Sequence, residues 1–165
     1  MEEYLKQLPT LAAQSKKENQ QYFAVLKKRT PKNLDYIMQE LHDKEFEKTD
    51  CLTCGNCCKT TSPIFTEKDI ERISKSLKMK VLNFTNQYLR RDEDDFMVLK
   101  TAPCSFLDLQ NNECTIYDVR PKACREFPHT DRKKFNQITD LTLLNVAICP
   151  AAYNIVEKMK EKLSL

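Results

Sequence analysis

The sequence contains one glycine, Gly55, among 165 residues. Soluble proteins average about 7% glycine, so this composition argues against a loop-rich secreted scaffold. The chain also has no glycine-rich phosphate loop, no His-Glu-x-x-His pair and no Cys-x3-Cys-x2-Cys radical motif. These absences leave the sequence without an independent catalytic motif.

Long apolar runs and an excess of one charge are missing as well. No apolar stretch approaches the roughly 20 residues that span a bilayer, and the N-terminus lacks the basic and apolar regions of a signal peptide. The net charge is +3, from 27 basic and 24 acidic residues. We therefore expect a cytoplasmic protein with no membrane contact, and nucleic acid is not an expected partner. The basic clusters 27–29 and 132–134 are more simply solvated faces than a nucleic-acid surface, and no protein partner is indicated.

Cysteine is abundant: the chain has eight, and four of them lie in the eight positions Cys51 to Cys58. Eight thiols are compatible with four disulfides. In a reducing compartment, however, dense cysteines more often bind metal or carry out redox chemistry. The adjacent Cys57 and Cys58 would also make four unstrained bridges awkward. A metal site is the better interpretation.

Helical periodicity covers much of the chain. Apolar residues recur at helical spacing, Thr66 is placed to cap a helix, and Pro150 suits a helix start. The expected helices are 1–29, 31–46, 67–79, 81–89 and 150–163, with one short helical turn between Pro121 and Pro128. The stretch 141–148 is apolar without a clear period.

A small sheet is expected in the second half of the chain. Residues 96–99 are apolar and partly β-forming, and the segments 105–107 and 114–117 flank a turn at Asn111-Asn112. We interpret 90–95 as a solvated turn. The predicted fold class is α+β and mainly α, with helices around a cysteine-rich metal core and a small antiparallel β-hairpin. We expect an N-terminal helical segment, 1–48, and a cysteine-cluster domain, 49–165, which together form one compact unit.

The spacing of the cysteines suggests how they bind metal. Two Cys-x-x-Cys steps overlap in the first cluster, and Gly55 fits a turn that needs a positive φ. The remaining thiols lie at loops or element ends, where each can point toward a common site. All eight are candidate ligands: Cys51, Cys54, Cys57, Cys58, Cys104, Cys114, Cys124 and Cys149.

Zinc and iron–sulfur sites both fit this pattern. Zinc takes four thiolates tetrahedrally, so eight cysteines supply two sites. Three close cysteines with a remote Cys149-Pro150 are also similar to a ferredoxin arrangement, which would hold iron, including a 4Fe-4S cluster. Because Cys57 and Cys58 are adjacent, either they face two metals or one of them is not a ligand.

Basic and histidine residues near the cysteines are candidate supporting groups. Four thiolates around Zn²⁺ or a [4Fe–4S]²⁺ core leave a net charge of −2, which is costly to bury uncompensated. Five cations lie close in sequence and could hydrogen-bond to sulfur: Lys59, Arg120, Lys122, Arg125 and Arg132. His129 is a candidate further ligand or supporting residue, whereas His42 is more simply a polar residue beside a helix stripe.

The ordered motifs resemble a known family, the YkgJ-type cysteine-cluster family of zinc- or iron-chelating domains. The matching motifs span roughly residues 50–150: Cys51-x2-Cys54-x2-Cys57-Cys58, Pro103-Cys104-Ser-Phe-Leu107, Cys114-Thr-Ile-Tyr117-x2-Arg120-Pro121-x2-Cys124-Arg125-x-Phe127-Pro128 and Cys149-Pro150. The resemblance implies chelation of zinc or iron by the cysteines. The family is also described as similar to iron–sulfur oxidoreductases, and a similar cluster occurs in flagellin lysine N-methylases.

The leading functional hypothesis is a small metal-binding protein whose thiolates hold zinc or iron, including as an iron–sulfur cluster. The alternative is an iron–sulfur-dependent oxidoreductase or a methyltransferase-like enzyme that acts at the cluster. A zinc-ribbon-like nucleic-acid binder is a third interpretation, which the near-neutral charge does not favour. The first two differ in whether the metal has an open position or a substrate pocket beside it.

Overall fold

The computed structural model describes residues 1–164, and its contacts divide the chain into two compact units. The first, here called the helical unit, comprises Met1–Cys51 together with the segment from Pro128 onward. The second, the cysteine unit, is Leu52–Phe127. This grouping differs from the boundary expected near residue 48, because the C-terminal segment returns to pack on the N-terminal helices.

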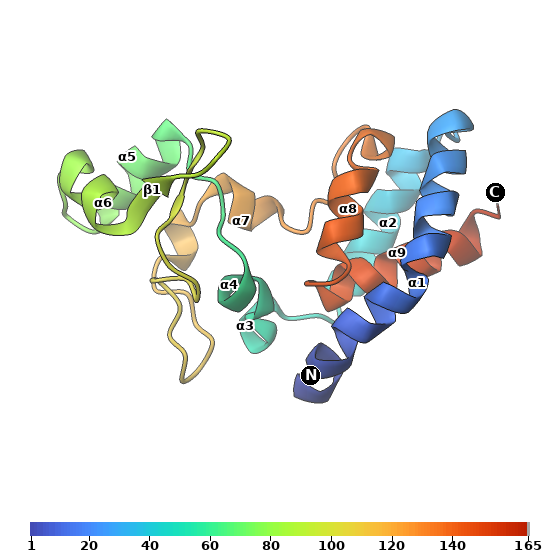
Figure 1. Cartoon of the computed structure of the whole chain (residues 1–165), viewed down its shortest axis with the longest axis horizontal. Helices are drawn as coiled ribbons and strands as arrows, with labels where there is room; N and C mark the ends of the chain where they lie inside the picture. The colour runs from blue at the N-terminus through green and yellow to red at the C-terminus, as the bar shows by residue number, and fades with distance from the viewer. Residues whose placement is uncertain (165) are drawn as a thin grey trace. The chain divides into compact units, whose positions relative to one another are not determined.

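The predicted fold class is confirmed, since the described residues are mainly helical with one small antiparallel sheet. In Figure 1 the helical unit contains the blue N-terminal helix and the orange-red C-terminal helices. Its elements are α1 (Glu2–Lys28), α2 (Leu34–Phe46), the 3-10 turn η2 (Phe135–Gln137), α8 (Thr139–Asn145) and α9 (Pro150–Lys162).

The helices of the helical unit form because apolar residues recur at three- and four-residue steps and share a buried face. On α1 this face includes Leu8, Ala12, Phe23 and Leu26, and it joins a single core with residues of α2, α8 and α9. The five expected helices of residues 1–29, 31–46, 67–79, 81–89 and 150–163 are confirmed with small shifts at their ends. The apolar stretch 141–148 lies largely in α8, a helix that the sequence pattern did not reveal.

Asp35 helps to explain why the chain returns to the helical unit after residue 127. Its carboxylate accepts hydrogen bonds from the backbone N–H groups of Lys134 (2.7 Å) and Phe135 (3.0 Å). Phe135 is fully buried and its ring lies 6.4 Å from that of Phe23. The start of η2 is therefore held to α2 by hydrogen bonds and to α1 by aromatic packing.

The cysteine unit is built from shorter elements. They are α3 (Cys51–Cys54, which begins at the unit boundary), α4 (Asn56–Thr60), α5 (Glu67–Ser76), α6 (Val81–Tyr88), β1 (Leu89–Arg91), β2 (Met97–Leu99), the 3-10 turn η1 (Tyr117–Val119) and α7 (Lys122–Glu126). The expected helical turn between Pro121 and Pro128 is confirmed as α7. Figure 1 shows these elements in green to light orange.

The β-structure differs from the expected hairpin. The ladder pairs β1 with β2, with Arg90 opposite Val98, whereas 90–95 was interpreted wholly as a solvated turn. Around the Asn111-Asn112 turn only one bridge forms, between Leu107 and Cys114. The sequence pattern missed β1 because three residues are too few to show a two-residue period.

A cluster of aromatic rings forms the core of the cysteine unit. Phe84 is fully buried and contacts the rings of Phe65, Tyr88 and Phe106 at centroid distances of 6.3, 5.3 and 6.2 Å. Ile70, Ile73, Leu89, Leu99 and Ile116 complete the cluster. This core positions the cysteine loops described below.

No helix within residues 1–164 combines the length and the apolar composition that crossing a bilayer requires. The longest helix, α1, carries charged residues at both ends and at its centre, in residues 16–18.

Candidate metal centre

The cluster Cys51 to Cys58 folds as two short helices joined by Gly55. Gly55 adopts a left-handed conformation with φ of +58° and is the N-cap of α4. The expected positive φ at this residue is therefore confirmed. The junction turns the chain between Cys54, which is buried, and Cys57 and Cys58, which are half-buried.

Replacing Gly55 with alanine should destabilise the metal-free protein. A Cβ there would lie 3.2 Å from the side-chain atoms of Asn112, and a left-handed L-residue costs about 1–2 kcal/mol. We expect urea unfolding to show a loss of at least that size in the free energy of unfolding. The double variant Gly55→Ala with Asn112→Gly should regain the part of the lost stability that is due to crowding by the Asn112 side chain. An unchanged midpoint in Gly55→Ala would contradict this account.

Cys104 and Cys114 lie in two matching turns, Cys104-Ser-Phe-Leu107 and Cys114-Thr-Ile-Tyr117. In each turn the fourth residue donates its N–H to the cysteine carbonyl, at 3.0 and 3.2 Å. The N–H groups of Phe106 and Leu107 also donate to the Cys104 sulfur, and that of Ile116 donates to the Cys114 sulfur. Hydrogen bonds from backbone amides favour a thiolate over a thiol. Both turns therefore have the backbone support that a metal-bound sulfur needs.

The residue two positions after each of these cysteines anchors its turn in the core. Phe106 and Ile116 are both about 4% exposed and belong to the aromatic cluster. The two turns are also joined directly, because Thr115 donates its N–H to the Phe106 carbonyl at 2.8 Å. Cys104 and Cys114 are thus tied to each other and to one core.

Cys58 and Cys124 are brought to the same region from either side in sequence. The Cys104 N–H donates to the Cys58 carbonyl at 2.8 Å, which fixes the end of α4 beside the first turn. Cys124 lies in the middle of α7, with its N–H donating to the Pro121 carbonyl at 3.0 Å. Each is held by backbone hydrogen bonds that do not involve its sulfur.

The thiols of Cys58, Cys104, Cys114 and Cys124, here called the quartet, lie within electrostatic range of one another. The pKa of Cys124 is raised by the charges of Cys58, Cys104 and Cys114. The pKa of Cys104 is raised by the charges of Cys58 and Cys114, and the pKa of Cys114 is raised by the charge of Cys58. Every pair in the quartet therefore interacts. All four side chains belong to the cysteine unit, and none is in a disulfide.

The quartet thiols differ in their readiness to ionise. Burial, reinforced by neighbouring thiols, raises the pKa of Cys104 to about 11 and that of Cys124 to about 12. Burial also raises the pKa of Cys114. For Cys58, the hydrogen bond with the Cys57 thiol outweighs burial and lowers the pKa to about 7, with help from Lys59. Without a cation, three thiols hold their protons at neutral pH.

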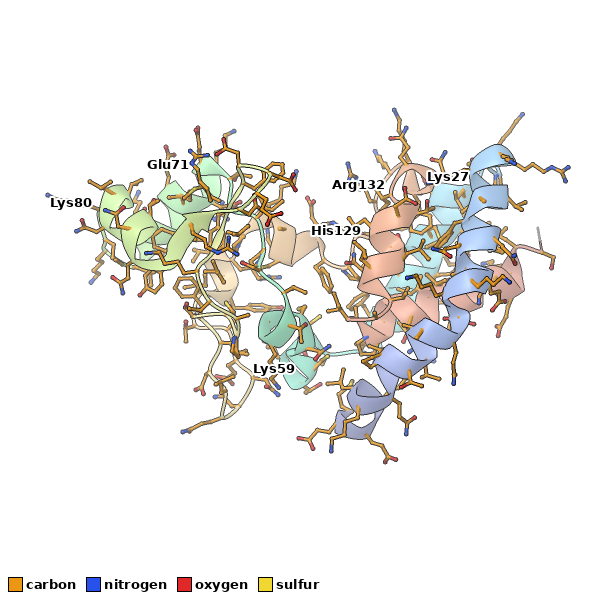
Figure 2. The ribbon with its side chains drawn as sticks, in the orientation of Figure 1. Lys27, Lys59, Glu71, Lys80, His129 and Arg132 are labelled. Carbon is orange, nitrogen blue, oxygen red and sulfur yellow. The ribbon has the colours of Figure 1, made fainter. Side chains whose placement is uncertain are left out.

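Two of the five candidate cations act on the quartet. The charge of Lys59 lowers the pKa of Cys58, and that of Arg120 lowers the pKa values of Cys114 and Cys124. Figure 2 shows Lys59 on α4. The Arg120 guanidinium is held over the Tyr117 ring at 3.8 Å. Two positive charges match the −2 of a tetrathiolate site.

Lys122 and Arg125 have other partners in the cysteine unit. The Lys122 ammonium lies 3.6 Å from the Glu126 carboxylate, and Arg125 donates to the Arg120 carbonyl at 2.8 Å. Arg132 and His129 belong to the helical unit, where His129 has a φ of 67°. His42 also lies there, and its Nδ1 is 2.8 Å from the Thr130 hydroxyl.

The other four predicted ligands lie in α3, in α4 and at the N-cap of α9. Cys51 is exposed, Cys54 is buried, and Cys57 contacts Cys58. Cys149 belongs to the helical unit, caps α9, and accepts the Ala152 N–H at 3.5 Å. Within residues 1–164, no group of three or more histidine, cysteine, aspartate or glutamate side chains is arranged to hold a metal ion. The quartet is accordingly a set of interacting donors and not a formed cage.

The chemistry of the quartet fits zinc or iron. Four thiols are the number that a tetrahedral zinc ion or an iron–sulfur cluster takes. Amides donate to two of the sulfurs, and two cations lie within electrostatic range. These features favour the ionised form that ligation requires.

Sequence reasoning did not identify two residues that hold α7 in place, Asp69 and Arg72. Asp69 is buried in the first turn of α5, and its pKa is lowered: burial opposes ionisation, but hydrogen bonds from Thr66 and Arg72 outweigh it. Arg72 pairs with it at 2.6 Å. The acidic residue three positions after Thr66 signals a capping box, but nothing local signals a partner fifty residues away.

A family model matches residues 50–142, more than half of the chain. Its name is CxxCxxCC and its description is "putative zinc- or iron-chelating domain". The chain belongs to this family. The family match therefore supports metal binding and confirms the resemblance drawn from the cysteine motifs. No solved structure matches the chain.

Proposed function

We propose that the cysteine unit is a metal-binding module in which Cys58, Cys104, Cys114 and Cys124 chelate one zinc or iron centre. The observations that carry this proposal are the backbone hydrogen bonds that join Cys58 to Cys104 and the Cys104 turn to the Cys114 turn, together with the electrostatic interaction of all four thiols. The family match supports zinc or iron as the element. When bound, the centre supplies four metal–thiolate bonds that join α4, the two turns and α7.

Different residues of the cysteine unit contribute to metal binding in different ways. The N–H groups of Phe106, Leu107 and Ile116 stabilise two of the thiolates. Lys59 and Arg120 offset negative charge. The Cys58 thiol, with its pKa of about 7, is the first to ionise and so provides the initial anionic donor.

The choice between zinc and an iron–sulfur cluster is tested by composition. We expect the full-length chain, purified without oxygen, to retain zinc or iron in stoichiometric amount. A brown protein with iron and acid-labile sulfide would establish a cluster, and a colourless protein with zinc would establish the mononuclear site. Recovery of a folded chain that neither retains nor takes up either metal would overturn the proposal.

A further inference from the structure

The Asp69 carboxylate divides its two oxygens between two tasks. Oδ2 accepts hydrogen bonds from the Thr66 N–H (3.0 Å) and the Thr66 hydroxyl (2.7 Å), which closes the capping box of α5. Oδ1 accepts from Arg72 Nη2 (2.6 Å) and from the Lys122 N–H (3.1 Å). The first task and the contact with Arg72 lie within α5, whereas the hydrogen bond from Lys122 reaches the start of α7.

Arg72 extends the same connection. Its Nε donates to the Val119 carbonyl at 3.3 Å, and its Nη2 also donates to the Arg120 carbonyl at 2.9 Å. Together with Asp69 it therefore binds three backbone groups between residues 119 and 122. The charged pair is short, and the Asp69 side chain is only 2% exposed, so the hydrogen bonds to its carboxylate are shielded from water.

Residues 119–122, which Asp69 and Arg72 hold as a clamp, include Arg120 and lead directly into α7, the helix that carries Cys124. Arg120 supplies the positive charge near Cys114 and Cys124. Lys122 begins α7, and Cys124 is the third residue of that helix. Pro121 has no N–H to donate. Asp69 and Arg72 therefore bind this segment through the Lys122 N–H and the carbonyls of Val119 and Arg120.

We propose that Asp69 and Arg72 are positioning residues that hold Cys124 and Arg120 ready for the metal. This inference rests on the proposed function of the quartet. By fixing the segment before α7 in the metal-free chain, the clamp removes an ordering cost that binding would otherwise have to meet. Its loss should therefore weaken metal binding beyond any effect on overall stability.

Arg72→Gln and Thr66→Ala are a matched pair for this test. Arg72→Gln removes the ion pair with Asp69 and the hydrogen bonds to the Val119 and Arg120 carbonyls, and it leaves the Oδ2 cap. Thr66→Ala removes the hydroxyl part of the cap and leaves Oδ1 with its partners. Zn²⁺ affinity is measured on the full-length chain by chelator competition, together with the Co²⁺ absorption spectrum. Exchange of the Lys122 amide is followed by NMR in the metal-free protein.

We expect Arg72→Gln to weaken Zn²⁺ binding about 10- to 100-fold, as loss of outer-shell partners typically does, and to alter the Co²⁺ spectrum. The Lys122 amide should lose part of its protection, because Arg72 no longer orients its acceptor, Asp69 Oδ1. Thr66→Ala should lower the melting temperature but leave affinity within about twofold and the Lys122 amide protected. Arg72→Lys keeps the charge but cannot reach all three acceptors, so its affinity should be intermediate.

Equal Zn²⁺ affinities for Arg72→Gln and Thr66→Ala would overturn the positioning role while leaving the proposed function intact. If Arg72→Gln does not fold, the comparison of Arg72→Lys with Thr66→Ala decides by the same criterion. If the wild-type chain takes up no metal, the proposed function fails. In that case, loss of Lys122 protection in the Arg72 variant alone would still support the clamp, and retained protection would refute it.

Discussion

Replacing Cys124 with serine should weaken metal binding by the quartet about 10²- to 10³-fold. Structural zinc sites contribute apparent binding free energies of about 10–16 kcal/mol, so one thiolate in four corresponds to about 2.5–4 kcal/mol. A serine hydroxyl does not ionise at neutral pH and cannot take the thiolate's place. The measurement is chelator competition with Zn²⁺, with metal content per chain determined after dialysis.

Ala123→Ser is the matched control, because it introduces the same side chain one residue earlier in α7. It should retain wild-type affinity. Cys51→Ser, at an exposed cysteine outside the quartet, should also leave the quartet's metal in place.

A double-variant cycle distinguishes one shared site from separate sites. Cys58→Ser and Cys124→Ser should each remove the same metal equivalent, and the double variant should remove no more than either alone. Additive losses of metal would show that these two thiols serve different centres. That result would contradict the quartet as a single site.

Metal affinity should fall steeply on acidification, by about a thousandfold per pH unit near pH 7. Ligation needs thiolates, and the metal-free chain holds protons on Cys104 and Cys124, with pKa values of about 11 and 12, and on Cys114, whose pKa is also raised. Binding therefore releases between three and four protons at pH 7, because Cys58 is itself about half protonated there. The number approaches four below the pKa of about 7 of Cys58.

The direction of this pH dependence follows from the direction of the thiol pKa shifts. A raised thiol pKa favours the protonated, metal-free state, so protons compete with the metal more strongly as the pH falls. Zn²⁺ affinity at several pH values between 6 and 8, and proton release measured calorimetrically in buffers of different ionisation enthalpy, check the prediction. A slope of one proton or fewer would contradict it. The Cys114→Ser variant should show a slope smaller by about one.

Much of the fold follows from local pattern. The period of apolar residues predicts α1, α2, α5, α6 and α9, because each forms a buried stripe of its own. The elements that the pattern misses are β1 and α8. β1 has too few residues to show a period, and α8 lies in an apolar stretch whose residues are not segregated onto one face.

The candidate site, like the fold, could be predicted only in part from the local sequence. Spacing and compartment predict that the cysteines bind metal, and Gly55 between two Cys-x-x-Cys steps predicts a left-handed turn. Neither predicts that Cys104 and Cys114 occupy equivalent turns, since that equivalence lies in their N–H···S bonds and in the burial of Phe106 and Ile116. Asp69 and Arg72 could not be found locally either, because their partners lie about fifty residues downstream.

The sequence by itself indicated the chemistry: eight candidate thiol ligands, the nearby cations and the family to which the motifs belong. Only the tertiary structure decided which thiols interact. Cys57 completes the second Cys-x-x-Cys step, yet it is the Cys58 carbonyl that accepts the Cys104 N–H, and the core fixes Cys104. The proposed choice of ligands rests on long-range hydrogen bonds and packing, and sequence spacing does not encode either.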